Sequence, residues 1–152
     1  MPVDYVWRLL LAAGLGAALG VEREYWQKPA GLRTNILIAI GSALFTLISL
    51  GMTTGTGDPS RVAGQIVTGI GFLGGGAIMR NRNTVHGMTT AATIWVNAAI
   101  GIAAGSGLYL LATFATGMTL VVLVLLPFVE KRFERRAEWA KLHDRSNSSS
   151  RR

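Results

Sequence analysis

An uncharged, apolar and glycine-rich run, Val62–Met79, constrains the fold of this chain more than any other stretch. As a helix rising 1.5 Å per residue it would be about 27 Å long, close to the thickness of a bilayer core. In water, each glycine in a helix interior would cost about 1 kcal/mol relative to alanine. In lipid, glycines instead let neighbouring helix backbones approach closely. We therefore expect this run to be the central helix of a membrane bundle, with the other helices packed around it.

Four other apolar segments flank this run: Tyr5–Val21, Thr34–Met52, Met88–Ala104 and Leu108–Val129. Each is long enough to cross a bilayer core with modest tilt. Only 15% of the residues are charged, against about 25% in a typical soluble domain. The sequence therefore predicts an all-α fold, a polytopic membrane helix bundle of five transmembrane helices.

Glycines four residues apart predict which helix faces pack closely, because small side chains let helix backbones approach one another. The predicted packing positions are Gly16, Gly20, Gly64, Gly71, Gly75, Gly101 and Gly105. The same small-residue faces predict that the protein associates with itself as a homo-oligomer.

The distribution of Lys and Arg predicts the orientation in the membrane. Basic residues gather in the loop after Tyr5–Val21 and in the loop after Val62–Met79, whereas the loop after Met88–Ala104 has none. Under the positive-inside rule the two basic loops and the basic C-terminal tail are cytoplasmic. Five crossings, with the N-terminus outside and the C-terminus inside, satisfy every segment.

Residues 130–152 form a basic tail that follows the membrane domain, residues 1–129. The tail holds eight Lys/Arg and four Asp/Glu, so +4 of the net charge of +7 lies there. Basic residues beside an apolar segment favour contact with anionic lipid, and we expect no nucleic-acid binding. We expect Glu130–His143 to form a short cytoplasmic juxtamembrane helix, with Trp139 at the interface and disorder from Asp144 onward.

Charged residues gather where the first two segments meet the cytoplasm. Glu22, Arg23 and Glu24 end the first segment, and Arg33 precedes the second. The turn Pro29–Gly31 brings these positions together. They either form a network that closes the cytoplasmic mouth of the bundle or serve as ordinary interfacial charge.

Arg8 interrupts the first segment, four residues after Asp4, so the two side chains can pair on one helix face. Arg8 either snorkels to the interface or faces a functional cavity in the bundle.

Asp58 opens the central run, followed by Pro59 and Arg61. An aspartate before a proline is typical of a helix N-cap. The alternative is an external carboxylate that meets cations, although a divalent ion requires several oxygen ligands and Asp58 alone supplies too few.

Polar groups also occur within the apolar segments. Gln65 and Asn97 either hydrogen-bond between helices or mark a polar track through the bundle. Thr90, or its neighbour Thr89, is placed to cap the start of the fourth segment. None of the helix cores carries a carboxylate, so a dehydrated divalent cation would be poorly compensated there.

The sequence contains few residue patterns typical of a catalytic site or a metal site. The chain has no cysteine, and its two histidines, His86 and His143, share no ligand spacing. No catalytic dyad or triad is evident. We therefore expect no enzymatic activity, no cofactor and no metal site.

Three ordered sequence blocks resemble the signatures of the MgtC/SapB family. The blocks are Gly20–Glu24 with Lys28–Thr34, then Asp58–Ala63 with Gln65–Val67 and Gly69–Gly74, and finally Thr84–Val85 with Gly87–Trp95. The resemblance covers roughly residues 10 to 125 and departs from the family at His86, where a basic arginine is expected. Longer members also carry a soluble C-terminal domain that has no counterpart in this sequence.

The resemblance implies a protein of the bacterial inner membrane that is linked to magnesium limitation and, in pathogens, to survival inside host phagocytes. It further implies a regulator acting through membrane partners, with the membrane sector of the ATP synthase as one such partner. Two other functions stay open. One is a small transporter or channel for magnesium or another ion, and the other is a lipid-handling or structural protein.

Overall fold

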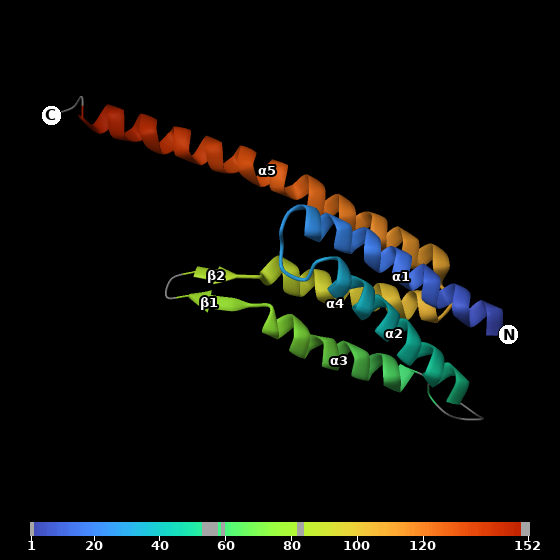
Figure 1. Cartoon of the computed structure of the whole chain (residues 1–152). Coiled ribbons are helices and arrows are strands. Elements are labelled where there is room, and N and C mark those ends of the chain that lie inside the picture. The colour runs from blue at the N-terminus through green and yellow to red at the C-terminus, as the bar shows by residue number, and fades with distance from the viewer. Residues whose placement is uncertain (1, 53–57, 59, 82–83, 150–152) are drawn as a thin grey trace. The chain divides into compact units, whose positions relative to one another are not determined.

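Five helices and one short hairpin follow one another along the chain in the computed structural model (Figure 1), which describes residues 2–52, 58, 60–81 and 84–149. The helices are α1 (Pro2–Tyr25), α2 (Leu32–Met52), α3 (Ser60–Gly76), α4 (Met88–Gly105) and α5 (Tyr109–Ser149). Strands β1 (Met79–Asn81) and β2 (Thr84–His86) pair antiparallel between α3 and α4. The predicted all-α fold is confirmed, and the hairpin is an addition that the sequence did not predict.

The lengths and compositions of the helices suit a membrane protein. Among the described residues, α1, α2, α4 and the Tyr109–Glu130 part of α5 are long and apolar enough to cross a bilayer. Helix α3 has 17 residues and ends at Gly76, short of the predicted Met79, because the chain there turns into β1. A fifth crossing by α3 and the orientation with the N-terminus outside stay predictions.

Helices α2 and α4, and not α3, form the centre of the bundle. Each of the two packs against α1, α3 and the other. Helix α3 buries Ile70 and Gly74 and lies at the edge of the bundle, mainly beside α4 (Figure 1). The predicted central position of Val62–Met79 is therefore wrong. Thr90 and Asn97 of α4 hydrogen-bond to Arg23 of α1 and Asn35 of α2, so polar residues within α4 are compatible with its central place.

Four of the predicted packing glycines lie at close contacts with α2. A Cβ atom on Gly16 would come within 2.7 Å of the Asn35 carbonyl oxygen, and one on Gly20 within 2.6 Å of the Leu32 Cα. On α4, a Cβ on Gly101 or Gly105 would meet the carbonyl oxygen of Ala39 or Ala43 at 2.5 or 2.7 Å. Only glycine fits at such distances.

The three predicted packing glycines of α3 have no such contact. A Cβ added to Gly64, Gly71 or Gly75 would have no heavy atom of the described chain within 4 Å. The prediction that these glycines pack within the bundle is therefore wrong for the single chain, and it fails because α3 lies at the edge.

The chain divides into two units, Met1–Leu120 and Val121–Arg152. The first contains α1 to α4, the hairpin and the start of α5. The second contains the rest of α5, which stays helical past Asp144 and has Pro127 in its interior. The boundary between the units lies within a helix and precedes the predicted boundary at residue 129.

Candidate functional site

A buried arginine joins the end of α1 to the start of α4. Arg23 lies in the last turn of α1, and its side chain is only 5% exposed. Its Nη2 donates to the Thr90 hydroxyl at 3.0 Å, and its Nη1 lies 3.7 Å from the Glu22 carboxylate. The structure thus brings together three candidate residues, Glu22, Arg23 and Thr90.

The pairing of these charges is incomplete. The buried Arg23 Nε and Glu22 Oε2 have no hydrogen-bond partner among the described residues. A buried charge that loses its partner costs several kcal/mol, so both groups depend on the few contacts that they make. This incompletely paired cluster is the strongest candidate site in the bundle.

Thr90 does not cap α4, contrary to prediction. The N-cap residue is Gly87, which is left-handed with φ at 90° and provides no side-chain cap hydrogen bond. A Cβ on Gly87 would overlap the Ala77 carbonyl oxygen at the end of α3. Glycine is therefore required there both by the backbone conformation and by the close approach of α3.

Glu24 holds the turn between α1 and α2. Its Oε2 accepts a hydrogen bond from the Leu32 backbone N–H at 3.1 Å, which caps the start of α2. A Cβ on Gly31 would overlap the same carboxylate. Arg33 is exposed in the first turn of α2 and takes part in neither of the ion pairs found among the described residues. The predicted charge network therefore includes Glu22 and Arg23, whereas Glu24 and Arg33 lie apart from it.

Two fully buried asparagines connect α2 to α4. Asn97 Nδ2 donates to the Asn35 backbone oxygen at 2.7 Å and to its Oδ1 at 3.1 Å. Asn35 Nδ2 in turn donates to the carbonyl oxygens of Ala30 and Gly31, which fixes the α1–α2 turn. Asn97 thus hydrogen-bonds between helices, one of its two predicted roles. Asn35 was not predicted from the sequence as a site residue, although a single asparagine at the start of an apolar run indicates a buried hydrogen bond.

A second polar cluster lies where α4 connects to α5. Asp4 pairs with Arg8 at 2.6 Å, as predicted, and also accepts a hydrogen bond from the Tyr109 hydroxyl at 2.9 Å. Arg8 Nη1 donates to the Gly105 carbonyl oxygen at 2.9 Å. Arg8 therefore fastens the end of α4 to α1.

Asp58 caps α3. Its Oδ1 accepts a hydrogen bond from the Ser60 backbone N–H at 2.9 Å. Hydrogen bonds from the Ser60 side chain and backbone lower the pKa of the Asp58 carboxyl, and the nearby Arg61 charge acts in the same direction. Arg61 is exposed, and Pro59 lies outside the described residues. No group of three or more His, Asp or Glu in the described part of the chain could hold a metal ion.

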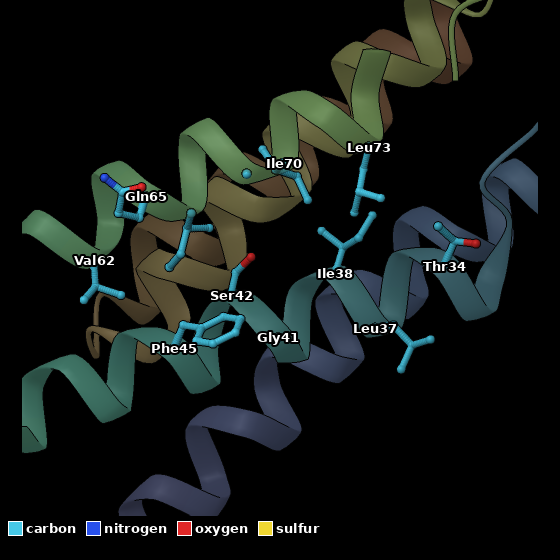
Figure 2. A pocket seen from close by; sticks show the side chains of 12 residues that line it. Thr34, Leu37, Ile38, Gly41, Ser42, Phe45, Val62, Gln65, Ile70 and Leu73 are labelled. Carbon is cyan, nitrogen blue, oxygen red and sulfur yellow. The ribbon is translucent and has the colours of Figure 1, made fainter. Parts of the chain in front are cut away.

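A groove between α2 and α3 contains the remaining candidate, Gln65. Apolar residues line most of it, and Ile38 of α2 points toward Leu73 of α3 at one end (Figure 2). Gln65 is an exposed member of the lining. Gln65 thus borders this groove, whereas Asn97 is buried against Asn35, and a polar track through the bundle stays a prediction.

Apolar helices of membrane length and a buried polar network between them define a multi-pass helical membrane protein. Within this class, residues 9–132 match the MgtC family, and the chain belongs to that family.

Several curated relatives share about half of their aligned residues with this chain. The putative magnesium transporter YhiD of Escherichia coli K12 is 50% identical over an alignment of 130 residues that covers 81% of this chain and 60% of that protein. Protein MgtC of Salmonella typhimurium strain 14028s is 50% identical over 122 residues, 80% of this chain and 52% of that protein. The uncharacterized protein slr0014 of Synechocystis is 48% identical, covering 78% and 50% of the two chains.

The chain thus spans only 50 to 60% of the length of these relatives. No solved structure matches it.

Proposed function

We propose that this protein is a non-enzymatic regulator of magnesium homeostasis in the bacterial inner membrane, and that it acts by binding a membrane-protein partner. Membership of the MgtC family and the magnesium-related name of one relative support the link to magnesium. The hydrogen bonds that Arg23 and Asn97 make between helices are the observation that favours a regulator over a transporter.

A path for magnesium would need oxygen ligands to replace part of the hydration shell of the ion. In this bundle the Asn97 amide N–H group is bound to Asn35 of the neighbouring helix. Among the described residues, the buried side-chain oxygens without a hydrogen-bond partner are Asn97 Oδ1 and Glu22 Oε2, which are too few to replace the hydration shell of a divalent ion. The positive charge of Arg23 lies buried at the end of α1 and would repel a divalent cation. The polar interior is therefore suited to fastening helices and poorly suited to conducting a cation.

The open glycines of α3 are the surface that we assign to the partner. Gly64, Gly71 and Gly75 lie along one face of the helix, and each has free space where a Cβ would be. Small residues on a membrane helix let a second helix approach closely. The membrane sector of the ATP synthase is one candidate partner, and the basic tail after residue 129 provides contact with anionic lipid.

The test is purification from native membranes in mild detergent, followed by identification of co-purifying proteins. We expect one partner to be retained by the wild type and by Gly69→Leu, and to be lost from Gly71→Leu and Gly75→Leu, all of which still insert. A partner retained by every variant would remove the assignment to this face. Saturable magnesium flux into liposomes that hold the purified protein alone would overturn the regulator function.

Transport is the second candidate function. It is favoured by the name of the Escherichia coli relative and by Glu22 Oε2, which has no hydrogen-bond partner in the described structure and only a 3.7 Å ion pair with Arg23. A transport function predicts magnesium flux through the purified protein, and this flux should change in the Asp58→Asn variant. The absence of flux under any imposed gradient would exclude it.

A further inference from the structure

The groove between α2 and α3 is unfilled by the described chain. Its volume is about 580 Å³. Phe45 and Gly41 line it on α2, and Val62, Gln65 and Gly69 line it on α3. A Cβ on Gly41 or Gly69 would have no heavy atom of the described residues within 4 Å. The two helices therefore border an open, mostly apolar groove that another molecule can occupy.

The length of the groove suits a helix that lies along it. Its lining runs from Thr34 to Phe45 on α2 and from Val62 to Leu73 on α3. At 1.5 Å per residue this is a length of about 17 Å, or about three turns of a helix. The groove is therefore long enough for about three turns of a helix to lie along it.

The chemistry of Gln65 favours a helix from a second copy of this chain. The Gln65 amide has no hydrogen-bond partner among the described residues, and it borders an otherwise apolar groove. A side-chain amide both donates and accepts, so two glutamines satisfy each other. Two copies inserted in the same orientation relate by a two-fold axis along the membrane normal, and a residue near that axis meets its own counterpart.

We propose that two copies of this protein dimerise with α3 of each copy lying in the α2–α3 groove of the other, and with the two Gln65 amides hydrogen-bonded across the two-fold axis. In this dimer the two α3 helices are neighbours at the centre, and each α2 contacts both. The glycine-rich α3, which lies at the edge of the single chain, becomes central only in the pair.

This surface is distinct from the one assigned to the regulatory partner. Gly69 lines the groove, whereas Gly71 lies two residues further on, about 200° around the helix. Both positions have room for a larger side chain in the single chain. Gly69→Leu should therefore disrupt only dimerisation, and Gly71→Leu should disrupt only partner binding. This matched pair tests the two proposals separately.

Cysteine cross-linking in native membranes tests the dimer directly, because the chain has no cysteine of its own. We expect Gln65→Cys to form a disulfide-linked dimer on mild oxidation. Val67→Cys is the control, since Val67 is exposed on α3 at nearly the same depth and is not part of the groove. It is expected to stay monomeric.

Native mass spectrometry in mild detergent provides the second measurement. We expect a dimer for the wild type and for Gly71→Leu, a monomer for Gly69→Leu, and self-association weakened about threefold to tenfold for Gln65→Leu. Equal cross-linking at residues 65 and 67 would overturn the proposal. So would a Gln65→Cys adduct with a different protein, or a wild-type monomer, with or without a retained phospholipid.

Discussion

Arg23 Nη2 lies 3.0 Å from the Thr90 hydroxyl oxygen, and this one hydrogen bond joins residues 67 positions apart in the sequence. The donor ends α1 and the acceptor lies in the first turn of α4, so the bond fixes the spacing of two helices. Because the guanidinium is buried and incompletely paired, the loss of any remaining contact should destabilise the fold more than the loss of an exposed hydrogen bond.

Thr90→Val removes the hydroxyl with little change of shape. We expect the free energy of unfolding in detergent to fall by about 1–3 kcal/mol, because the Arg23 guanidinium loses a buried acceptor. Thr113→Val is the control, since the Thr113 hydroxyl bonds the Tyr109 carbonyl oxygen within its own helix at an exposed position. Equal losses of unfolding free energy in the two variants would show that the hydrogen bond to Arg23 contributes no more than an exposed hydrogen bond within one helix.

Asn35 and Asn97 form a second pair suited to a double-mutant cycle. Each change to alanine is expected to destabilise the bundle, with an interhelical contribution of about 0.6–1.7 kcal/mol. The double variant should lose less than the sum of the single losses, because both remove the same hydrogen bonds. Reversible unfolding in mixed detergent measures this coupling, and strict additivity would contradict it.

Gly101→Ala tests the close contact between α4 and α2. The added methyl group would overlap the Ala39 carbonyl oxygen, so we expect a loss of about 1–3 kcal/mol from overpacking. Gly64→Ala places the same group in open space on α3 and should be neutral or slightly stabilising, since alanine favours the helix. Thermal unfolding measures the stability of both variants. A Gly64→Ala variant less stable than Gly101→Ala would refute the packing described for α4.

The start of α3 should respond to pH through Asp58. Hydrogen bonds from Ser60 lower the folded-state pKa of this carboxyl below its usual value of 3.8. The stabilisation is therefore fully present above the unfolded-state pKa and is lost as the pH falls below 3.8 and through the lowered folded-state pKa. The protection of the backbone amides in the first turn of α3, measured relative to their intrinsic exchange rates at each pH, should fall over this range in the wild type. The same loss of protection in Asp58→Asn, which cannot titrate, would count against Asp58 as its source.

The sequence located the helices because long uncharged apolar runs leave few other structures in a membrane. It did not locate β1 and β2, since strands of three residues are too short to show a pattern. At the candidate site, the proximity of Glu22 to Arg23 followed from the sequence, but the contact with Thr90 did not. A threonine at a helix start is normally read as a cap, and no local pattern reveals an acceptor for a distant arginine.

The sequence by itself determined that this protein is a helical membrane protein of the MgtC family, and it identified the glycines at which helices could meet. Only the tertiary structure decided which of those glycines are used within the chain. Gly101 and Gly105 contact α2, whereas Gly71 and Gly75 face open space. The physical reason is that glycine permits close approach without specifying the neighbour. Hydrogen bonds between distant side chains, such as Asn97 to Asn35, select the central helices.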